Sequence, residues 1–311
     1  MRETVTERSD VGGDDIRLDS GPGIDGLDLT DTARQLLFHG RLLDRAAAMR
    51  PMQATVCRLA AVMVDPDCSI EDVAKELRLD PPLVAALLKE ANSAASAPVA
   101  GISSIQAAAT RLGLARVLAV AAGSMLGPTA QRSLEAYQLG PGGLWDHSIL
   151  SSYVAEAIYG MGRDGIGPEV VASALLHHMG KIILNDILEP SQFHSAIMVN
   201  GSSDAAEREL IDVDHAEMGA VLLEMWNLPA SITEPIRFHH APDRTEWPAA
   251  HVVNIASIIG RELGGIARPG GPDMDDLLLD ASLEALSLER EAVVHVTTSL
   301  LVLAGRIPNR A

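Results

Sequence analysis

The chain has 311 residues, of which 47% are hydrophobic and only 3% aromatic, so Leu, Ala, Val, Ile and Met must supply most of its core. Its formal net charge of −18 argues against a broad nucleic-acid surface, which needs clustered Lys and Arg. The two cysteines, Cys57 and Cys68, cannot build a disulfide framework. The first residues also lack the apolar run of a secretory signal, and no apolar stretch is long enough to span a bilayer. We therefore expect a protein of the reducing cytoplasm.

The first third of the chain predicts a tail followed by short helices. Residues 1–30 hold eight acids and three bases among Gly, Ser and Thr, which is typical of a disordered acidic tail that is dispensable for folding. Residues 31–48 predict a leading helix that ends before Pro51. The next helices are expected at 52–64, at 70–78 with Ser69 as its cap, and at 81–92 with Asp80 as its cap and two prolines in its first turn.

The remainder also favours helices throughout. Residues 102–126 predict two helices that meet at Gly113, and a longer helix opens near Trp145. Further helices are expected at 168–177, 181–187, 203–211, 214–226, 229–239, 248–263 and 282–304. Residues 264–273, rich in Gly and Pro, predict a loop. Because no segment alternates with period two, we expect an all-α fold.

Histidines recur near the ends of the predicted helices. Neutral imidazoles that converge from several helices can hold a divalent metal, and such a metal can convert water into a hydroxide nucleophile. The histidines in suitable places are His147, His177, His178, His215, His239, His240 and, more loosely, His251. Lys181, which follows the adjacent pair, would contact phosphate in an enzyme of this kind.

Five strings in order resemble the HDOD family, the HD-related output domain of bacterial signalling proteins. They are DPDCSIEDVAKELRLDPPLVAALLKEANSA, GISSIQAAATRLGLARVLAVA, LWDHSILSSYVAEAI, ALLHHMGKIIL and ELIDVDHAEMGAVLLEMWNLPASITEPIRFHH. They extend over about two-thirds of the chain, from Met49 to Asp243. The resemblance implies an all-helical, regulatory domain related to HD and HD-GYP phosphohydrolases, with degraded catalytic motifs.

Two carboxylates of an HD phosphohydrolase are absent from the sequence. His178 occupies the place of the paired aspartate, and the stretch that should hold a later aspartate offers only Asn254 and Ser257. A neutral ring brings one lone pair and no charge, so it cannot bridge two hard metals as a carboxylate does. The remaining histidines could still hold a transition metal such as Zn, Ni or Fe, but not Mg or Mn.

Two other interpretations stay open from the sequence. The histidines could be structural residues, since a protonated imidazole is favourable at a helix C-terminus. Residues 69–92 could form a helix-turn-helix that binds DNA, but residues 81–92 carry only Lys89 and Asn92 as base-reading groups. The stripe of Leu83, Leu87 and Ala91 favours a core position instead.

The organisation we expect is a tail (1–30), a leading helix (31–48), an HDOD-like domain (49–245) with lobes at about 49–130 and 131–245, and a helical extension (246–311). The predicted function is a non-catalytic signal-transduction output or adaptor domain that binds a protein partner or a small ligand such as a nucleotide. A metal-dependent phosphohydrolase acting on nucleotides or cyclic dinucleotides is the alternative, and a DNA-binding regulator comes third. We expect no catalytic residue, no obligatory cofactor and no membrane association. A transition metal bound to the histidines is the exception to be tested.

Overall fold

The computed structural model describes residues 31–49, 53–65, 67–93, 101–264 and 273–303. Residues up to Gly40 belong to one unit, and Arg41–Ala311 form a second, compact unit. The predicted acidic tail lies outside the described residues. Within them every regular element is helical, and the only extended pairing is an isolated bridge between Leu134 and Leu139. The all-α prediction is confirmed.

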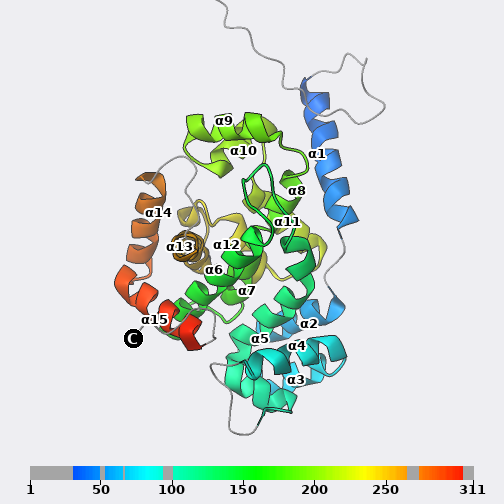
Figure 1. The fold of residues 1–311 in the computed structure, drawn as a ribbon, viewed down its shortest axis with the longest axis vertical. Coiled ribbons are helices and arrows are strands. Elements are labelled where there is room, and N and C mark those ends of the chain that lie inside the picture. The colour runs from blue at the N-terminus through cyan, green and yellow to red at the C-terminus, as the bar shows by residue number, and fades with distance from the viewer. Residues whose placement is uncertain (1–30, 50–52, 66, 94–100, 265–272, 304–311) are drawn as a thin grey trace, which may run out of the picture. The chain divides into compact units, whose positions relative to one another are not determined.

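Short helices form the first packed group (Figure 1). They are α2 (Ala54–Met63), α3 (Ile70–Leu77), α4 (Pro81–Ala91) and the start of α5 (Ile105–Ala130), and they follow the leading helix α1 (Asp31–Ala48). Both predicted caps are present, because the side chains of Ser69 and Asp80 accept hydrogen bonds from the first turns of α3 and α4. Leu83, Leu87 and Ala91 are buried, which confirms that this face of α4 belongs to the core.

The helix α5 contains a break that was predicted from the sequence. Gly113 has φ 74° and ψ 157°, so two helical pieces meet there. The stretch Ile105–Ser124 is long and apolar enough to cross a membrane by length and composition alone, contrary to the expectation from the sequence. Half of that stretch is buried inside the fold, and α5 packs against α3, α4 and α7. Neither piece on its own reaches the roughly 20 residues that a membrane span requires, so we interpret α5 as a core helix.

The second group of helices surrounds the histidines. It comprises α6 (Gly143–Gly160), α7 (Val170–Leu176), α8 (Met179–Leu184), α9 (Pro190–Asn200), α10 (Ser203–Ile211), α11 (His215–Met225), α12 (Ala230–Arg237), the 3₁₀ helix η2 (Pro242–Arg244) and α13 (Ala249–Leu263). The helix α6 packs against α7 and α13, and α11 packs against α8 and α12. These contacts bring the ends of α7, α8, α11 and α12 close to the first turn of α6.

Two predictions about helices were wrong. The helix α9 was not expected, although Pro190 opens it and Gly201, with φ 81°, ends it. The predicted single helix at 282–304 is two helices, α14 (Asp273–Ala285) and α15 (Arg290–Leu303). Ser287 adopts φ 51° between them and Leu288 donates its backbone N–H to the carbonyl of Leu283, so the chain turns where we expected it to continue.

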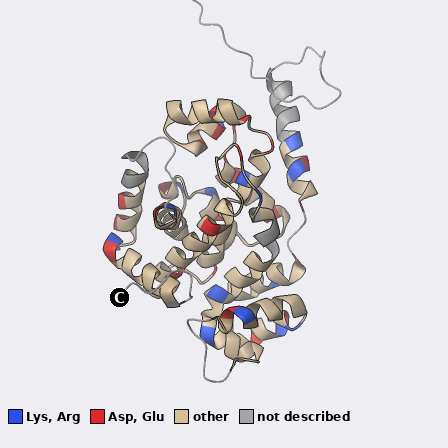
Figure 2. Cartoon of the chain, in the orientation of Figure 1, with Lys and Arg blue, Asp and Glu red and all other residues tan. Residues whose placement is uncertain are grey.

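Charged residues do not form a basic face on the described helices. Figure 2 shows Lys and Arg dispersed over several helices and interspersed with Asp and Glu. On α4 the single basic residue, Lys89, is followed directly by Glu90. This arrangement gives no support to the DNA-binding alternative, which needs a stripe of Lys and Arg against phosphates.

Candidate functional site: a buried histidine cluster

Six histidines come together in the interior of the second group of helices. Five of their rings are at most 7% exposed, and the sixth, His240, is half-buried. Neighbouring ring centroids lie 3.7–5.9 Å apart. The residues of this histidine cluster are His147, His177, His178, His215, His239 and His240. All six were candidates from the sequence.

A close contact between two helices holds α8 and α11 together at the cluster. The N-cap of α8 is His178, and α11 begins at His215. Gly180 lies directly against the backbone of α11, where an added Cβ would clash with the carbonyl oxygen of His215 and the backbone of Gly219. Since only glycine at this position allows the two backbones to approach, Gly180 places the rings of His178 and His215 with their centroids 4.9 Å apart.

Backbone carbonyls fix the orientation of two rings. His177 places Nδ1 2.7 Å from the carbonyl oxygen of Ala174, and His239 places Nδ1 2.6 Å from that of Ile236. A carbonyl oxygen only accepts, so each Nδ1 must carry the proton and donate it. Each Nε2 is therefore unprotonated and carries a free lone pair. Neither Nε2 has a hydrogen-bond partner among the described residues.

Glu207 fixes the third ring and was missed by the sequence analysis. This carboxylate on α10 is fully buried, and its Oε2 accepts from both the backbone N–H and the Nδ1–H of His215, each at 2.7 Å. Its Oε1 accepts from the hydroxyl of Tyr137 at 2.7 Å. Burial raises the pKa of Glu207 to about 7, while the positive charge of Lys181 and the hydrogen bonds from Tyr137 and His215 act in the opposite direction. The Nε2 of His215 therefore faces the cluster as an acceptor.

Two of the three remaining rings, His240 and His147, differ in their surroundings. His240 places Nε2 3.0 Å from Nε2 of His215, and because His215 accepts there, His240 donates. On α6, the Nδ1 of His147 is buried without a hydrogen-bond partner among the described residues, and its Nε2 lies 3.5 Å from Oγ of Ser151. His147 is thus held mainly by packing.

Burial keeps the cluster neutral. Desolvation lowers the pKa of His147 and of His240 to about 3, and it holds the pKa values of the other four rings well below 6.5. The charge of Lys181, whose Nζ lies 5.2 Å from the centre of the Tyr137 ring, acts in the same direction on all six. The interpretation of these residues as protonated helix caps therefore does not fit their environment, and neutral rings keep their lone pairs for a metal.

The residues at the two positions where an HD phosphohydrolase carries its acids make other contacts in this structure. His178 is inside the cluster, with its ring centroid 3.7 Å from that of His177. Asn254 on α13 is buried and donates from Nδ2 to the carbonyl oxygen of His239 at 2.8 Å, and its Oδ1 accepts from the hydroxyl of Ser282. Asn254 thus fixes the backbone beside a cluster histidine. Ser257 is also buried, and His251 contacts Ser282 rather than joining the cluster.

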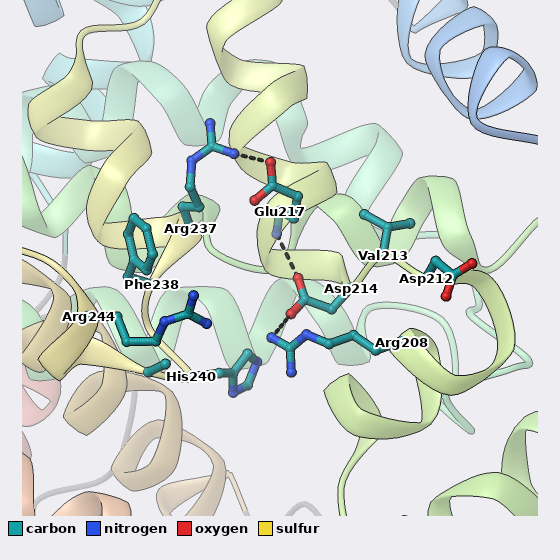
Figure 3. A pocket seen from close by; sticks show the side chains of 10 residues that line it. Arg208, Asp212, Val213, Asp214, Glu217, Arg237, Phe238, His240 and Arg244 are labelled. Atoms are coloured by element: carbon teal, nitrogen blue, oxygen red, sulfur yellow. Dashed lines mark hydrogen bonds and ion pairs between the residues drawn. The ribbon is translucent and has the colours of Figure 1, made fainter. Parts of the chain in front are cut away.

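A cavity of about 340 Å³ opens beside the cluster and reaches it at His240 (Figure 3). Its walls come from α10, α11, α12 and η2. The carboxylates of Asp214 and Glu217 line it, and they pair with Arg208 and Arg237 respectively. This cavity is one opening toward the buried histidines, which it reaches through His240.

Comparisons with known proteins agree with this architecture. An uncharacterized protein of Treponema pallidum (strain Nichols) is 25% identical over 242 residues, which are 72% of this chain and 44% of the relative, so the chain spans less than half of that relative's length. A crystal structure of an HDOD domain protein from Geobacter sulfurreducens superposes with a TM-score of 0.62 at 20% identity, covering 90% of this chain and 99% of the other.

Two further crystal structures carry different functional names. One is a candidate signal transduction protein from Marinobacter aquaeolei VT8, with a TM-score of 0.61 and 21% identity over 89% of this chain and 65% of the other. The second is a candidate phosphohydrolase from Shewanella amazonensis SB2B, with a TM-score of 0.56 and 19% identity over 85% of this chain and 95% of the other. At these identities the likeness shows the fold alone. The model of the HDOD domain matches residues 49–242, and the chain belongs to the HDOD family.

Proposed function

We propose that this chain is a non-catalytic signal-transduction output domain that acts by binding a protein partner or a small ligand. The observation that carries the proposal is the composition and closure of the histidine cluster. Hydrolysis by a metal site requires an open coordination position for water and access for the phosphate. Here the rings lie in a helical core. Among the described residues, two groups have ligand atoms close enough to share a metal ion, and both groups consist of histidine alone.

The nearest buried carboxylate does not supply the missing acid. Glu207 accepts hydrogen bonds from three donors of Tyr137 and His215, so both of its oxygens are already engaged. Its role is to orient His215. A two-metal hydrolytic centre needs an anionic bridge between the ions, and by the resemblance to HD phosphohydrolases His178 occupies the sequence position of the bridging aspartate.

The name borne by the Marinobacter aquaeolei VT8 structure supports a signalling role, and the Shewanella amazonensis SB2B name keeps the phosphohydrolase alternative open.

An assay of phosphodiester hydrolysis tests the proposal. Purified protein, supplied in turn with Mn²⁺, Mg²⁺, Fe²⁺ and Ni²⁺, should not hydrolyse cyclic dinucleotides or a chromogenic phosphodiester above the metal-only background. The variant His178→Asp should also fail, because no acid occupies the region of Asn254 and Ser257.

Metal-dependent turnover by the wild type that is lost in His177→Ala would overturn the proposal. If no turnover is found, a pull-down from the native cell, with the chain as bait, identifies what the non-catalytic domain binds. The cavity at His240 has the size of a site for a small ligand, since such cavities usually measure about 300–1,000 Å³.

A further inference from the structure

The buried nitrogens that lack hydrogen bonds point to a ligand in the cluster. His147 Nδ1, His177 Nε2 and His239 Nε2 are fully enclosed, and none has a partner among the described residues. A buried polar atom without a partner is unfavourable, because it gives up the hydrogen bonds that it makes with water in the unfolded chain. Three such atoms on adjacent rings therefore call for one common explanation rather than three separate defects.

Two groups of histidines have the spacing of metal ligands. One is His147, His177 and His178, and the other is His178, His215 and His239, with the ligand atoms of each group within 4.8 Å of one another. Nitrogens bound to one tetrahedral ion lie about 3.3 Å apart, so shifts of about 1 Å per ring would close either group. Metal-binding histidines usually donate their second ring N–H to a carbonyl or carboxylate. His177, His215 and His239 already do so.

The first group is better prepared to bind than the second. His215 Nε2 already accepts a hydrogen bond from His240, which an ion would have to break. His147 Nδ1 and His177 Nε2 have no such competitor, and their ring centroids lie 4.8 Å and 3.7 Å from that of His178. His239 Nε2 is the nearby free nitrogen that can complete the coordination, with its ring centroid 5.2 Å from that of His177.

We infer that the cluster binds one borderline transition-metal ion, Zn²⁺, Ni²⁺, Co²⁺ or Fe²⁺, through His147, His177 and His178, with His239 as the fourth ligand. Neutral imidazole suits these ions, whereas Mg²⁺ and Ca²⁺ require oxygen ligands. The inference deepens the proposed function, on which it rests, by making the ion a bound ligand of the domain and not a hydrolytic cofactor.

The ion would also tie together four helices that the chain otherwise joins by packing. His147 lies in the first turns of α6, His177 and His178 lie between α7 and α8, and His239 follows α12. An ion that binds the folded chain and not the unfolded one stabilises the fold in proportion to its concentration. Thermal stability is therefore a readout that requires no enzymatic activity.

The test compares the full chain, with any histidine tag removed, against His147→Phe and His177→Phe. Phenylalanine keeps a ring in place and removes a buried unpaired nitrogen, so His147→Phe should fold at least as well as wild type in EDTA. His177→Phe also loses the hydrogen bond to the carbonyl of Ala174, so its stability in EDTA should stay close to that of wild type. For wild type, dialysis against Zn²⁺ or Ni²⁺ should leave one ion per chain by mass spectrometry of the metal. At free metal about 100-fold above Kd, its Tm should rise by about 5–10 °C.

Both Phe variants should lose the bound ion and the metal-dependent rise in Tm, and Mg²⁺ should raise the Tm of none of the proteins. The matched control is His240→Phe, which changes a cluster ring outside the assigned ligands and should keep one ion per chain. The inference is overturned if wild type retains no ion, or if His147→Phe retains it as wild type does. Because no substrate is present, this result is independent of the turnover assay: hydrolysis would refute the non-catalytic function, and absence of the ion would refute only the metal site.

Discussion

Glu207 offers the sharpest test of how the cluster is held. The substitution Glu207→Ala removes the acceptor for three donors, namely the Tyr137 hydroxyl and the backbone and ring N–H groups of His215. Glu207 and His215 are fully buried, and Tyr137 is half-buried. Each orphaned donor costs about 1–3 kcal/mol, and relief of the buried carboxylate's desolvation offsets part of the sum. We expect a net loss of about 3–5 kcal/mol in the free energy of unfolding.

The assay is urea unfolding followed by circular dichroism, in EDTA so that metal does not contribute. The midpoint should fall with an unchanged m-value, which would show that the loss is one of native stability. The matched control is Glu209→Ala on the same helix, where an exposed acid contacts Asn200, and its effect should stay below about 1 kcal/mol.

A second substitution separates the hydrogen bonds from the side-chain volume. Tyr137→Phe deletes one of the three donors and should cost less than Glu207→Ala. Combined with Glu207→Ala it should add less than its separate effect, since both changes remove the same bond. If Glu207→Ala unfolds within about 1 kcal/mol of wild type, the carboxylate does not support His215 and our account of the cluster's orientation is wrong.

Four other outcomes can be measured on the same preparation. Leu87→Ala should cost about 2–5 kcal/mol in urea, because this leucine is 1% exposed in the core, and a neutral effect would mean that the face is not packed. Gly180→Ala should lower Tm by several degrees through its clash with α11, whereas Gly160→Ala, which has open space around it, should not. In EDTA, the free energy of unfolding should decrease as pH falls below about 6.5, because the unfolded chain takes up protons that the buried rings refuse. The raised pKa values of Glu207, Asp214 and Glu169 oppose this trend, but they are three groups against the six rings, so a flat profile would mean that the rings are solvated. Deletion of residues 1–30 should leave Tm nearly unchanged, and a fall of many degrees would show that this segment packs on the domain.

The sequence was sufficient for the fold class and for the six cluster residues, because both depend on local patterns. Helical periodicity, the Ser69 and Asp80 caps and the break at Gly113 are all encoded within a few neighbouring residues. The histidines stood out because their residue type is rare and each is near a helix end.

The supporting contacts could not be predicted, because they join residues distant in the sequence. Glu207 is one acid among many in an acidic chain, and nothing beside it shows that α10 delivers it to Tyr137, 70 residues away. Asn254 looked like an absent ligand, but its amide supports the backbone of His239 across 15 residues.

The helix α9 was missed although its signals were local: Pro190 at its start and Gly201 after its end were enough to predict it.

The unpaired nitrogens of the cluster bear on whether the histidines only fill space or bind a ligand. If the histidines served only to fill space, apolar rings of similar size would do so without leaving nitrogens unpaired, and the chain would be more stable by about 1–3 kcal/mol for each one replaced. His147, His177 and His239 each carry such a nitrogen. Ala174 and Ile236 meanwhile fix the tautomers of His177 and His239 so that both lone pairs face their neighbours. Packing gains nothing from a fixed tautomer, whereas a metal ion depends on it. The proposed metal site would account both for the unpaired nitrogens and for the fixed orientation of the rings.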